Sequence, residues 1–272
     1  MSDKSKYLLQ LKTTDGFALK ILSEFFSSCL HRCIFEINSK GLCLNSVDSK
    51  EHRLLSMVLR QEKFIIFYNK NPFAFDINSG HLYKIIKTIK KKDNVMLFVL
   101  KDKPNKLGIT ISSSNNSDES NESTSFIEIS NSSPSNIVIP ENKEEYRLTC
   151  TGKDFQKLKS LASISNIMNI KAYEYNIVFY CDGEVVSKKI RIGESDSKES
   201  PPLLEENIQT SYITSLNKIA NMSSNVIIYI RKDGMINIVF DILSLGEFNI
   251  FIKSHRVIEE ETNENEEDDE EE

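Results

Sequence analysis

Residues 35–59, FEINSKGLCLNSVDSKEHRLLSMVL, decide the fold. Apolar and polar residues alternate in three short runs, which are separated by a Ser-Lys-Gly turn and a Val-Asp-Ser corner. Alternation with a period of two predicts half-buried strands, and such turns between them predict an antiparallel meander. Nothing in the stretch is arranged for catalysis. The sequence on either side must therefore show what this sheet is for.

One order of elements occurs twice, at an offset of roughly 138 residues. In the first half we predict a strand at 7–13, a helix at 15–31, four strands up to residue 68, a helix at 79–91, and strands at 94–100, 106–112 and 125–130. In the second half we predict a strand at 145–151, a helix at 153–165, strands at 167–173, 175–181 and 186–193, a helix at 209–221, and strands at 224–231, 235–241 and 246–253. The repetition predicts an α+β protein with two similar domains.

Polar segments mark the domain boundaries. We predict an N-terminal domain at 1–130 with a polar loop at 112–124, a connector at 131–144, a C-terminal domain at 145–258 and a disordered acidic tail at 259–272. The connector carries an apolar cluster, Ile137-Val138-Ile139. Apolar side chains in a connecting segment usually pack on the body of the protein or bind a partner.

The charge is unevenly distributed. The net charge is −6, but the last fourteen residues hold eleven acids and no base. Without them, 34 Lys and Arg face 29 Asp and Glu, which leaves about +5. An acidic tail on a mildly basic body favours a polyanion that binds one face. The alternative is a solubilising tail on an ordinary lysine-rich surface.

Lysines gather on the polar faces of the predicted helices. Lys84, Lys87 and Lys91 fall at i, i+3 and i+7, opposite an apolar stripe, and Lys153 and Lys157 lie likewise on the helix at 153–165. Such a row is usually a solvated face, but its duplication favours one extended ligand. Lysines without interleaved aromatic residues contact phosphates and do not read bases, so duplex DNA is the preferred ligand.

Cysteine and histidine spacings indicate neither an enzyme nor a metalloprotein. Cys29 and Cys33 are four apart on a predicted helix, a spacing that a metal could use, but no second pair follows, so buried thiols are favoured. No HxxxH or Ser-His-Asp spacing occurs. No apolar run approaches the roughly 20 residues of a membrane span, and the start lacks a signal peptide. We predict a soluble intracellular protein without catalytic residues, metal, cofactor or membrane contact.

Four segments share a family pattern. It starts in IFEINSKGLCLNSVDS (34–49) with a Leu-x-Ser-hydrophobic-Asp-Ser corner and continues through LRQEKFIIFYNKNPFAFDINSGHLYKIIK (59–87). It resumes in IVIPENKEEY (137–146) and closes with LGEFNIFIKSHRVIEEE (245–261). These segments resemble DNA sliding clamps of the proliferating cell nuclear antigen type. The abundance of Ile, Asn and Lys is typical of an AT-rich genome, such as that of a large DNA virus or a protist.

The resemblance implies a ring. Three two-domain subunits would close head to tail around duplex DNA, with helices lining the hole and sheets outside. Such a processivity factor needs no catalytic residue. It implies partnership with a DNA polymerase, a clamp loader, a flap nuclease and a ligase through short helical peptides, in replication and repair, in the nucleus or in a cytoplasmic viral factory. A subunit of a heterotrimeric checkpoint clamp and a monomeric viral processivity factor are the alternatives.

The resemblance also assigns residues to three surfaces. DNA contacts would come from Lys20, Lys84, Lys87, Lys91, Lys153, Lys157 and Lys218. Partner peptides would bind Val47, His52, Leu54, Ile137, Ile139, Pro140, Met235, Phe251 and Ile258, although His52 and Met235 depart from the family pattern. Subunits would join through edge strands near 124–129 and 187–192, at Phe126, Glu128, Lys189, Ile190 and Arg191.

Overall fold

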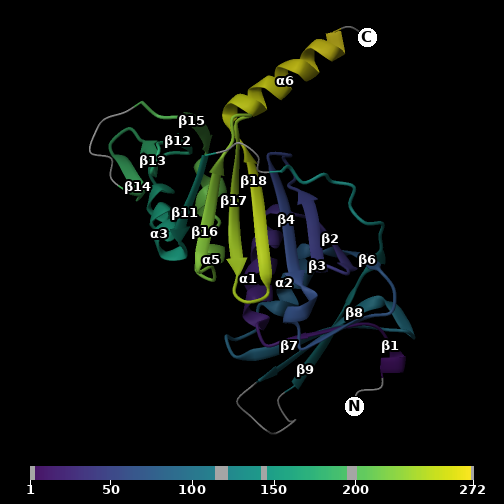
Figure 1. Ribbon diagram of the computed structural model, residues 1–272. Coiled ribbons are helices and arrows are strands. Elements are labelled where there is room, and N and C mark those ends of the chain that lie inside the picture. Colours follow the sequence, from purple (N-terminus) through teal and green to yellow (C-terminus); the bar gives the residue numbers. More distant parts are fainter. Residues whose placement is uncertain (1–3, 114–121, 142–145, 195–200, 271–272) are drawn as a thin grey trace. The chain divides into compact units, whose positions relative to one another are not determined.

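The chain divides into two compact units (Figure 1). The computed structural model describes residues 4–113, 122–141, 146–194 and 201–270, with backbone alone for residue 4 and for 264–270. Unit 1 comprises Met1–Ser49, Leu55–Val138 and Ile242–Phe248, and unit 2 comprises Lys50–Leu54, Ile139–Asp241 and Asn249–Glu272. The main division therefore falls inside the predicted connector. Each unit also takes in one short segment from the other half of the sequence, which the sequence pattern did not indicate.

Unit 1 is built from two antiparallel sheets and two helices. Its strands are β1 (Tyr7–Thr13), β2 (Arg32–Asn38), β3 (Gly41–Val47), β4 (Arg53–Arg60), β5 (Ile66–Asn69), β6 (Phe73–Asn78), β7 (Asp93–Leu100), β8 (Lys103–Ser113), β9 (Glu122–Glu128) and β10 (Ser130–Asn131), and its helices are α1 (Gly16–Cys29) and α2 (Ser79–Ile86), with 3₁₀ turns at Lys4–Lys6 and Gln61–Lys63. One sheet has the order β5-β1-β7-β8-β9, and the other runs β10-β6-β2-β3-β4.

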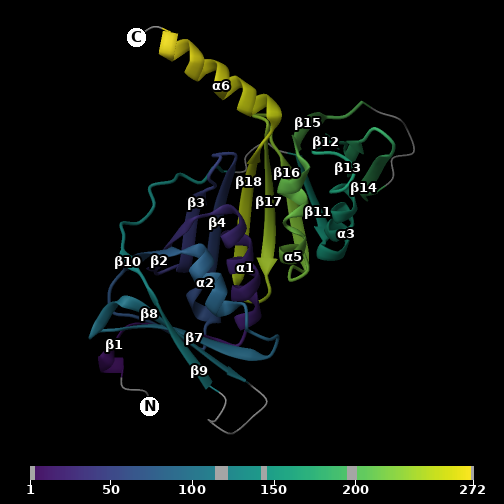
Figure 2. The same cartoon turned by 180° about the vertical axis from the view of Figure 1, so that it is seen from behind.

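The core of unit 1 lies between its helices and its sheets. Figure 2 shows α1 and α2 lying across one face of β2, β3 and β4. Phe26 of α1 and Leu82 of α2 meet Phe35 of β2 and Leu97 of β7 around a cavity of about 40 Å³. The burial of these apolar side chains is the main stabilisation of the unit.

Unit 2 repeats this plan. Its strands are β11 (Tyr146–Thr151), β12 (Ile167–Ala172), β13 (Asn176–Asp182), β14 (Ser187–Gly193), β15 (Leu204–Gln209), β16 (Asn225–Ile230), β17 (Met235–Ile242) and β18 (Gly246–Lys253), and its helices are α3 (Gly152–Gln156), α4 (Thr210–Thr214), α5 (Asn217–Ala220) and α6 (His255–Glu270), with a 3₁₀ turn at Lys157–Leu161. Phe155 and Phe240 are fully buried, with ring centres 5.4 Å apart in an edge-to-face arrangement.

Strand order confirms two similar domains. The order β1-β7-β8-β9 in unit 1 corresponds to β11-β16-β17-β18, and β6-β2-β3-β4 corresponds to β15-β12-β13-β14. The first helical segment follows the first strand in both units, and the second follows β6 or β15. The α+β fold with duplicated clamp-like domains is therefore confirmed.

The sequence pattern missed β6 and β15, the strand before the second helix of each unit. The β6 segment, FAFDIN, alternates clearly, but it follows Asn71-Pro72, which reads as a turn. The β15 segment, LEENIQ, is mostly polar, and only Glu206 and Ile208 are buried. A strand with so few apolar residues gives almost no periodic signal.

Three helices are shorter than predicted. The segment predicted at 79–91 is helical only to Ile86, because the Asp93 carboxylate accepts a hydrogen bond from the Lys90 amide and a turn carries Ile89 into the core. The segment at 153–165 passes into a 3₁₀ turn at Lys157. The segment at 209–221 is broken near Ser215, where the Asn217 side chain donates to the Thr214 carbonyl and competes with the helix ladder.

The acidic C-terminal segment is helical where we expected a disordered tail from residue 259. Helix α6 begins at His255, and Arg256 contacts Glu260 one turn later at 3.2 Å. Lys253, just before the helix, lies 2.7 Å from Glu261. Glutamate is a good helix former, and these ion pairs add local support, so the expectation of disorder was wrong for the backbone up to Glu270.

All five cysteines are buried thiols outside any disulfide, as predicted. Cys29 ends α1 and Cys33 lies in β2, so the two do not share a helix. Burial raises the pKa of the Cys33 thiol to about 12, with further contributions from Cys29 and Asp76. Among the residues that the structure describes, no three His, Cys, Asp or Glu side chains form a group that could hold a metal ion. No helix in the same residues is long and apolar enough to cross a membrane.

Candidate functional site

The lysines of unit 1 differ in how freely they can reach a ligand. Lys84 on α2 and Lys87 at its C-cap are exposed. Lys20 instead donates to the Ile89 carbonyl at 2.9 Å, and its ammonium lies 5.7 Å from the centre of the Phe17 ring. Lys91 falls beyond the helix and lies 5.9 Å from the same ring, so the helical row predicted to include it ends at Lys87. Of the predicted DNA-contacting lysines in this unit, Lys84 and Lys87 are therefore the better candidates for reaching a phosphate.

In unit 2, the predicted lysines lie on α3, on the following 3₁₀ turn and on α5. Lys153 and Lys218 are exposed. The Lys157 ammonium lies 2.8 Å from the Asp154 carboxylate. Hydrogen bonds from Lys157 and then Thr151 hold the pKa of Asp154 below its usual value. Lys157 therefore carries a local counter-charge that Lys84 and Lys87 lack in the described part of the chain.

Thr151 is the N-cap of α3, the helix that carries Lys153. Its hydroxyl oxygen accepts a hydrogen bond from the Asp154 amide at 3.1 Å. We expect Thr151→Ala to lower the free energy of unfolding by about 1 kcal/mol, the usual cost of losing such a cap. A urea titration would measure this, and Thr151→Ser, which keeps the hydroxyl, is the control. An alanine variant as stable as the serine variant would contradict a capping role.

A shallow hollow of about 730 Å³ joins two of the predicted surfaces of unit 2. Four lysines from the 3₁₀ turn and β14 line it, together with Gln156, Ser160 and Ile190: these are Lys157, Lys159, Lys188 and Lys189. Of the four, only Lys157 has a carboxylate partner among the residues described. The hollow thus has a strong excess of positive charge and places predicted DNA-contacting and subunit-contacting residues side by side.

The predicted subunit contacts lie on edge strands. In the described structure, β9 ends the sheet β5-β1-β7-β8-β9, and β14 ends the sheet β14-β13-β12-β15. Phe126 on β9 is 45 % exposed, and Glu128 beside it is also exposed. On β14, Lys189 and Arg191 are exposed and flank the half-buried Ile190. Open edges of this kind favour pairing with another chain.

The predicted partner-binding residues are distributed over both units. In unit 1, Val47 is 39 % exposed and Ile137 is half-buried. Val138, which belongs to the same apolar cluster but is not among the predicted partner-binding residues, is 86 % exposed. The connector before Ile137 is fixed by the Ser135 amide, which donates to Glu36 at 2.7 Å. Unit 1 therefore presents apolar side chains next to an anchored segment.

In unit 2, the partner-binding candidates range from half-buried to buried. Leu54, Ile139, Pro140, Met235 and Ile258 are half-buried. Phe251 is only 2 % exposed and belongs to the core, so it can support a binding surface but presents little of it.

His52 belongs to a polar contact that the sequence did not indicate. Its Nδ1 lies 2.9 Å from the Tyr212 hydroxyl, with the donor set by the tautomer. The Arg53 guanidinium covers the Tyr212 ring at 4.6 Å, and the His52 carbonyl accepts from the Lys253 amide at 3.0 Å. His52 therefore also ties the segment Lys50–Leu54 to the end of β18.

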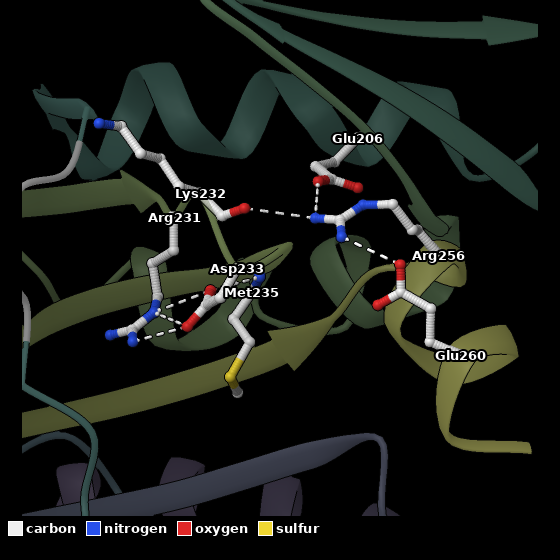
Figure 3. Close-up of polar contacts among 7 residues, drawn as sticks. All are labelled: Glu206, Arg231, Lys232, Asp233, Met235, Arg256 and Glu260. Carbon is white, nitrogen blue, oxygen red and sulfur yellow. Dashed lines mark hydrogen bonds and ion pairs between the residues drawn. The ribbon is translucent and has the colours of Figure 1, made fainter. Parts of the chain in front are cut away.

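Two arginines, Arg231 and Arg256, form a network of ion pairs and hydrogen bonds in the part of unit 2 that contains Met235 (Figure 3). Arg231 binds the Asp233 carboxylate through Nε and Nη2, and Arg256 donates to the buried Glu206 at 2.8 Å. Burial alone would raise the pKa of Asp233, but the hydrogen bonds from Arg231 and the Met235 amide and the charges of both arginines lower it. Sequence reasoning missed this network. The only signal was the turn sequence Lys-Asp-Gly at 232–234.

The duplicated two-sheet units, with open edges and exposed helix lysines, define a protein of the DNA clamp class. Residues 8–133 match the family described as "Proliferating cell nuclear antigen, N-terminal domain". A protein of Paramecium bursaria Chlorella virus 1 named "Probable DNA polymerase sliding clamp 1" is 20 % identical over 259 residues, which cover 92 % of this chain and 98 % of that protein. The "Proliferating cell nuclear antigen" of Chaetomium thermophilum is 21 % identical over 195 residues, covering 71 % of this chain and 74 % of that protein. The family match and these two relatives support a member of the DNA sliding clamp family.

Proposed function

We propose that this chain is a DNA polymerase processivity factor that encircles duplex DNA as a homotrimer. The observation that carries the proposal is the duplicated topology, in which each unit ends one sheet with an open strand, β9 or β14. Pairing β9 of one subunit with β14 of the next would satisfy both edges and close a head-to-tail ring. Holding a polymerase on its template in this way is a topological task and needs no catalytic residue.

The DNA contacts of the proposed ring would be electrostatic. The main contacts would come from lysines on helical segments or at their ends, namely Lys84, Lys87, Lys153, Lys157 and Lys218. Lys20 and Lys91, whose ammonium groups lie near the Phe17 ring, would be secondary contacts. Phosphate contacts carry no sequence information, so the ring could slide along any duplex. The place of action would be the site of DNA replication, either the nucleus or a viral factory.

Partner proteins would bind as short helices with apolar and aromatic anchors. The proposed residues are Val47, His52, Leu54, Ile137, Ile139, Pro140, Met235 and Ile258, with Phe251 as buried support. Polymerase, clamp loader, flap nuclease and ligase are the proposed partners, and each would compete for the same residues.

The solution mass tests the ring. We expect light scattering to give three times the chain mass of 31.2 kDa, and we expect this mass to persist on dilution to submicromolar concentration. Two edge strands with complementary charge and apolar residues favour self-association over a mixed ring. A monomer at every concentration would contradict the homotrimer and favour the heterotrimeric checkpoint clamp or the monomeric processivity factor.

A further inference from the structure

The tight hairpin from Arg231 to Met235, between β16 and β17, contacts two other segments of unit 2. One is the end of the connector at Glu141, and the other is the start of α6. The hairpin backbone is closed by the Arg231 amide, which donates to the Met235 carbonyl at 2.9 Å. Several candidate partner-binding residues of unit 2 belong to these segments or directly adjoin them. The hairpin is thus placed to control their geometry.

Arg231 fixes the connector through a side chain that is itself held rigid. Nε lies 3.1 Å and 3.0 Å from the two carboxylate oxygens of Asp233, and Nη2 lies 2.7 Å from Oδ2. Nη1 donates to the Glu141 carbonyl at 2.8 Å. The Arg231 side chain is only 14 % exposed. A planar guanidinium oriented by a bidentate carboxylate holds its other N–H donors in fixed directions.

Arg256 fixes the first turn of α6 in the same region (Figure 3). Its Nη2 donates to Glu206 of β15 at 2.8 Å, and the same nitrogen lies 3.4 Å from the Lys232 carbonyl in the hairpin. Its Nη1 reaches Glu260 at 3.2 Å. The Glu206 side chain is 8 % exposed, so this charge pair is largely shielded from water at one end. One guanidinium thereby links a sheet, a hairpin and a helix.

Gly234 makes the close approach possible. Its φ is +83°, a backbone conformation that favours glycine. A Cβ atom at this position would lie 2.5 Å from Nη2 of Arg256 and 2.7 Å from a methyl group of Val257. The Gly234 carbonyl also accepts from the Ser254 amide at 3.0 Å, just before α6 begins. Any side chain here would be strained by this φ and would displace the side chains of Arg256 and Val257.

We propose that Arg231 and Arg256 are positioning residues for partner docking, which hold Ile139-Pro140 and the first turn of α6 in the binding-competent arrangement. The inference rests on the proposed docking function. Neither arginine needs to touch the partner peptide. Each arginine restricts the conformations of a segment in the free protein. The peptide then does not have to order that segment on binding, and such preorganisation raises affinity.

The test combines hydrogen exchange with peptide binding on the full chain. Its probe is a short synthetic peptide with an aliphatic and an aromatic anchor at helical spacing. In Arg231→Ala, the amides of Ile139 and Glu141 should exchange faster, and peptide affinity should fall roughly ten-fold, as expected when one charge-assisted hydrogen bond no longer orders the segment. In Arg256→Ala, the amides of Val257 and Ile258 should respond instead. Arg231→Lys, which keeps the charge but loses the fork, should resemble Arg231→Ala.

Arg147→Ala is the matched control, because Arg147 is an exposed arginine of the same unit that covers the Tyr229 ring at 5.9 Å. It should change neither readout. Wild-type exchange and wild-type affinity in a folded Arg231→Ala variant would overturn the positioning role. A wild-type chain that does not bind the peptide would instead contradict the docking function, and the exchange data would still decide whether Arg231 holds the connector.

Discussion

Glutamine in place of both Lys84 and Lys87 is expected to weaken binding to duplex DNA by on the order of a hundred-fold at low salt. Both side chains are exposed, Lys84 on α2 and Lys87 at its C-cap, and neither has a carboxylate partner in the part of the chain that the structure describes. A ring of three subunits would lose two lysines from each. Titrations of labelled duplex over a range of salt concentrations would measure the loss.

The salt dependence gives the sharper result. Each lost phosphate contact should reduce the slope of log affinity against log salt by about 0.9. The loss should be equal on duplexes of unrelated sequence, because phosphate contacts carry no sequence information. Lys63→Gln with Lys70→Gln is the matched control, since both are exposed lysines of unit 1 outside α2. An equal loss in the control would show that overall charge matters and that α2 does not.

The fold was predictable where the strands and helices have a clear hydrophobic periodicity in the sequence. Alternation and the turns between β2, β3 and β4 predicted the meander, and the repeated order of elements predicted the duplication. The mostly polar β15 could not be found in this way. It is a strand because its backbone pairs with β12, and its side chains give almost no periodic signal. Helix ends were also missed. Helical phase put Lys91 in a row with Lys84, but Asp93 and the burial of Ile89 end the helix first.

The candidate site was predictable only in part. Exposed lysines and edge strands follow from patterns within single segments. The Arg231 and Arg256 network could not be predicted, because its partners Glu141 and Glu206 are distant in sequence and meet only in the folded unit. The same holds for His52 and Tyr212, 160 residues apart. Polar contacts between distant segments depend on the tertiary fold, and no local pattern encodes them.

Charge reversal on β14 is expected to open the ring. Lys188 and Lys189 are exposed on this edge strand, and the proposed neighbouring strand, β9, carries the exposed residues Glu122 and Glu128. Lys188→Glu with Lys189→Glu would replace attraction by repulsion at all three junctions of a homotrimer. Like charges facing each other across an interface disfavour association strongly. Light scattering should then show a monomer at concentrations where the wild type is a trimer, with trimer formation weakened by roughly a hundred-fold or more.

Reversal of the partner charge distinguishes a specific junction from a general charge effect. Adding Glu128→Lys to the doubly reversed chain should restore much of the trimer, because the new lysine would face the new glutamates of the next subunit. Lys63→Glu with Lys70→Glu changes the total charge equally on a different surface and should leave the trimer intact. A trimer that survives the reversal at β14 on dilution to submicromolar concentration would show that subunits join elsewhere. A reversal that Glu128→Lys fails to rescue would keep β14 in the junction but remove Glu128 as its partner.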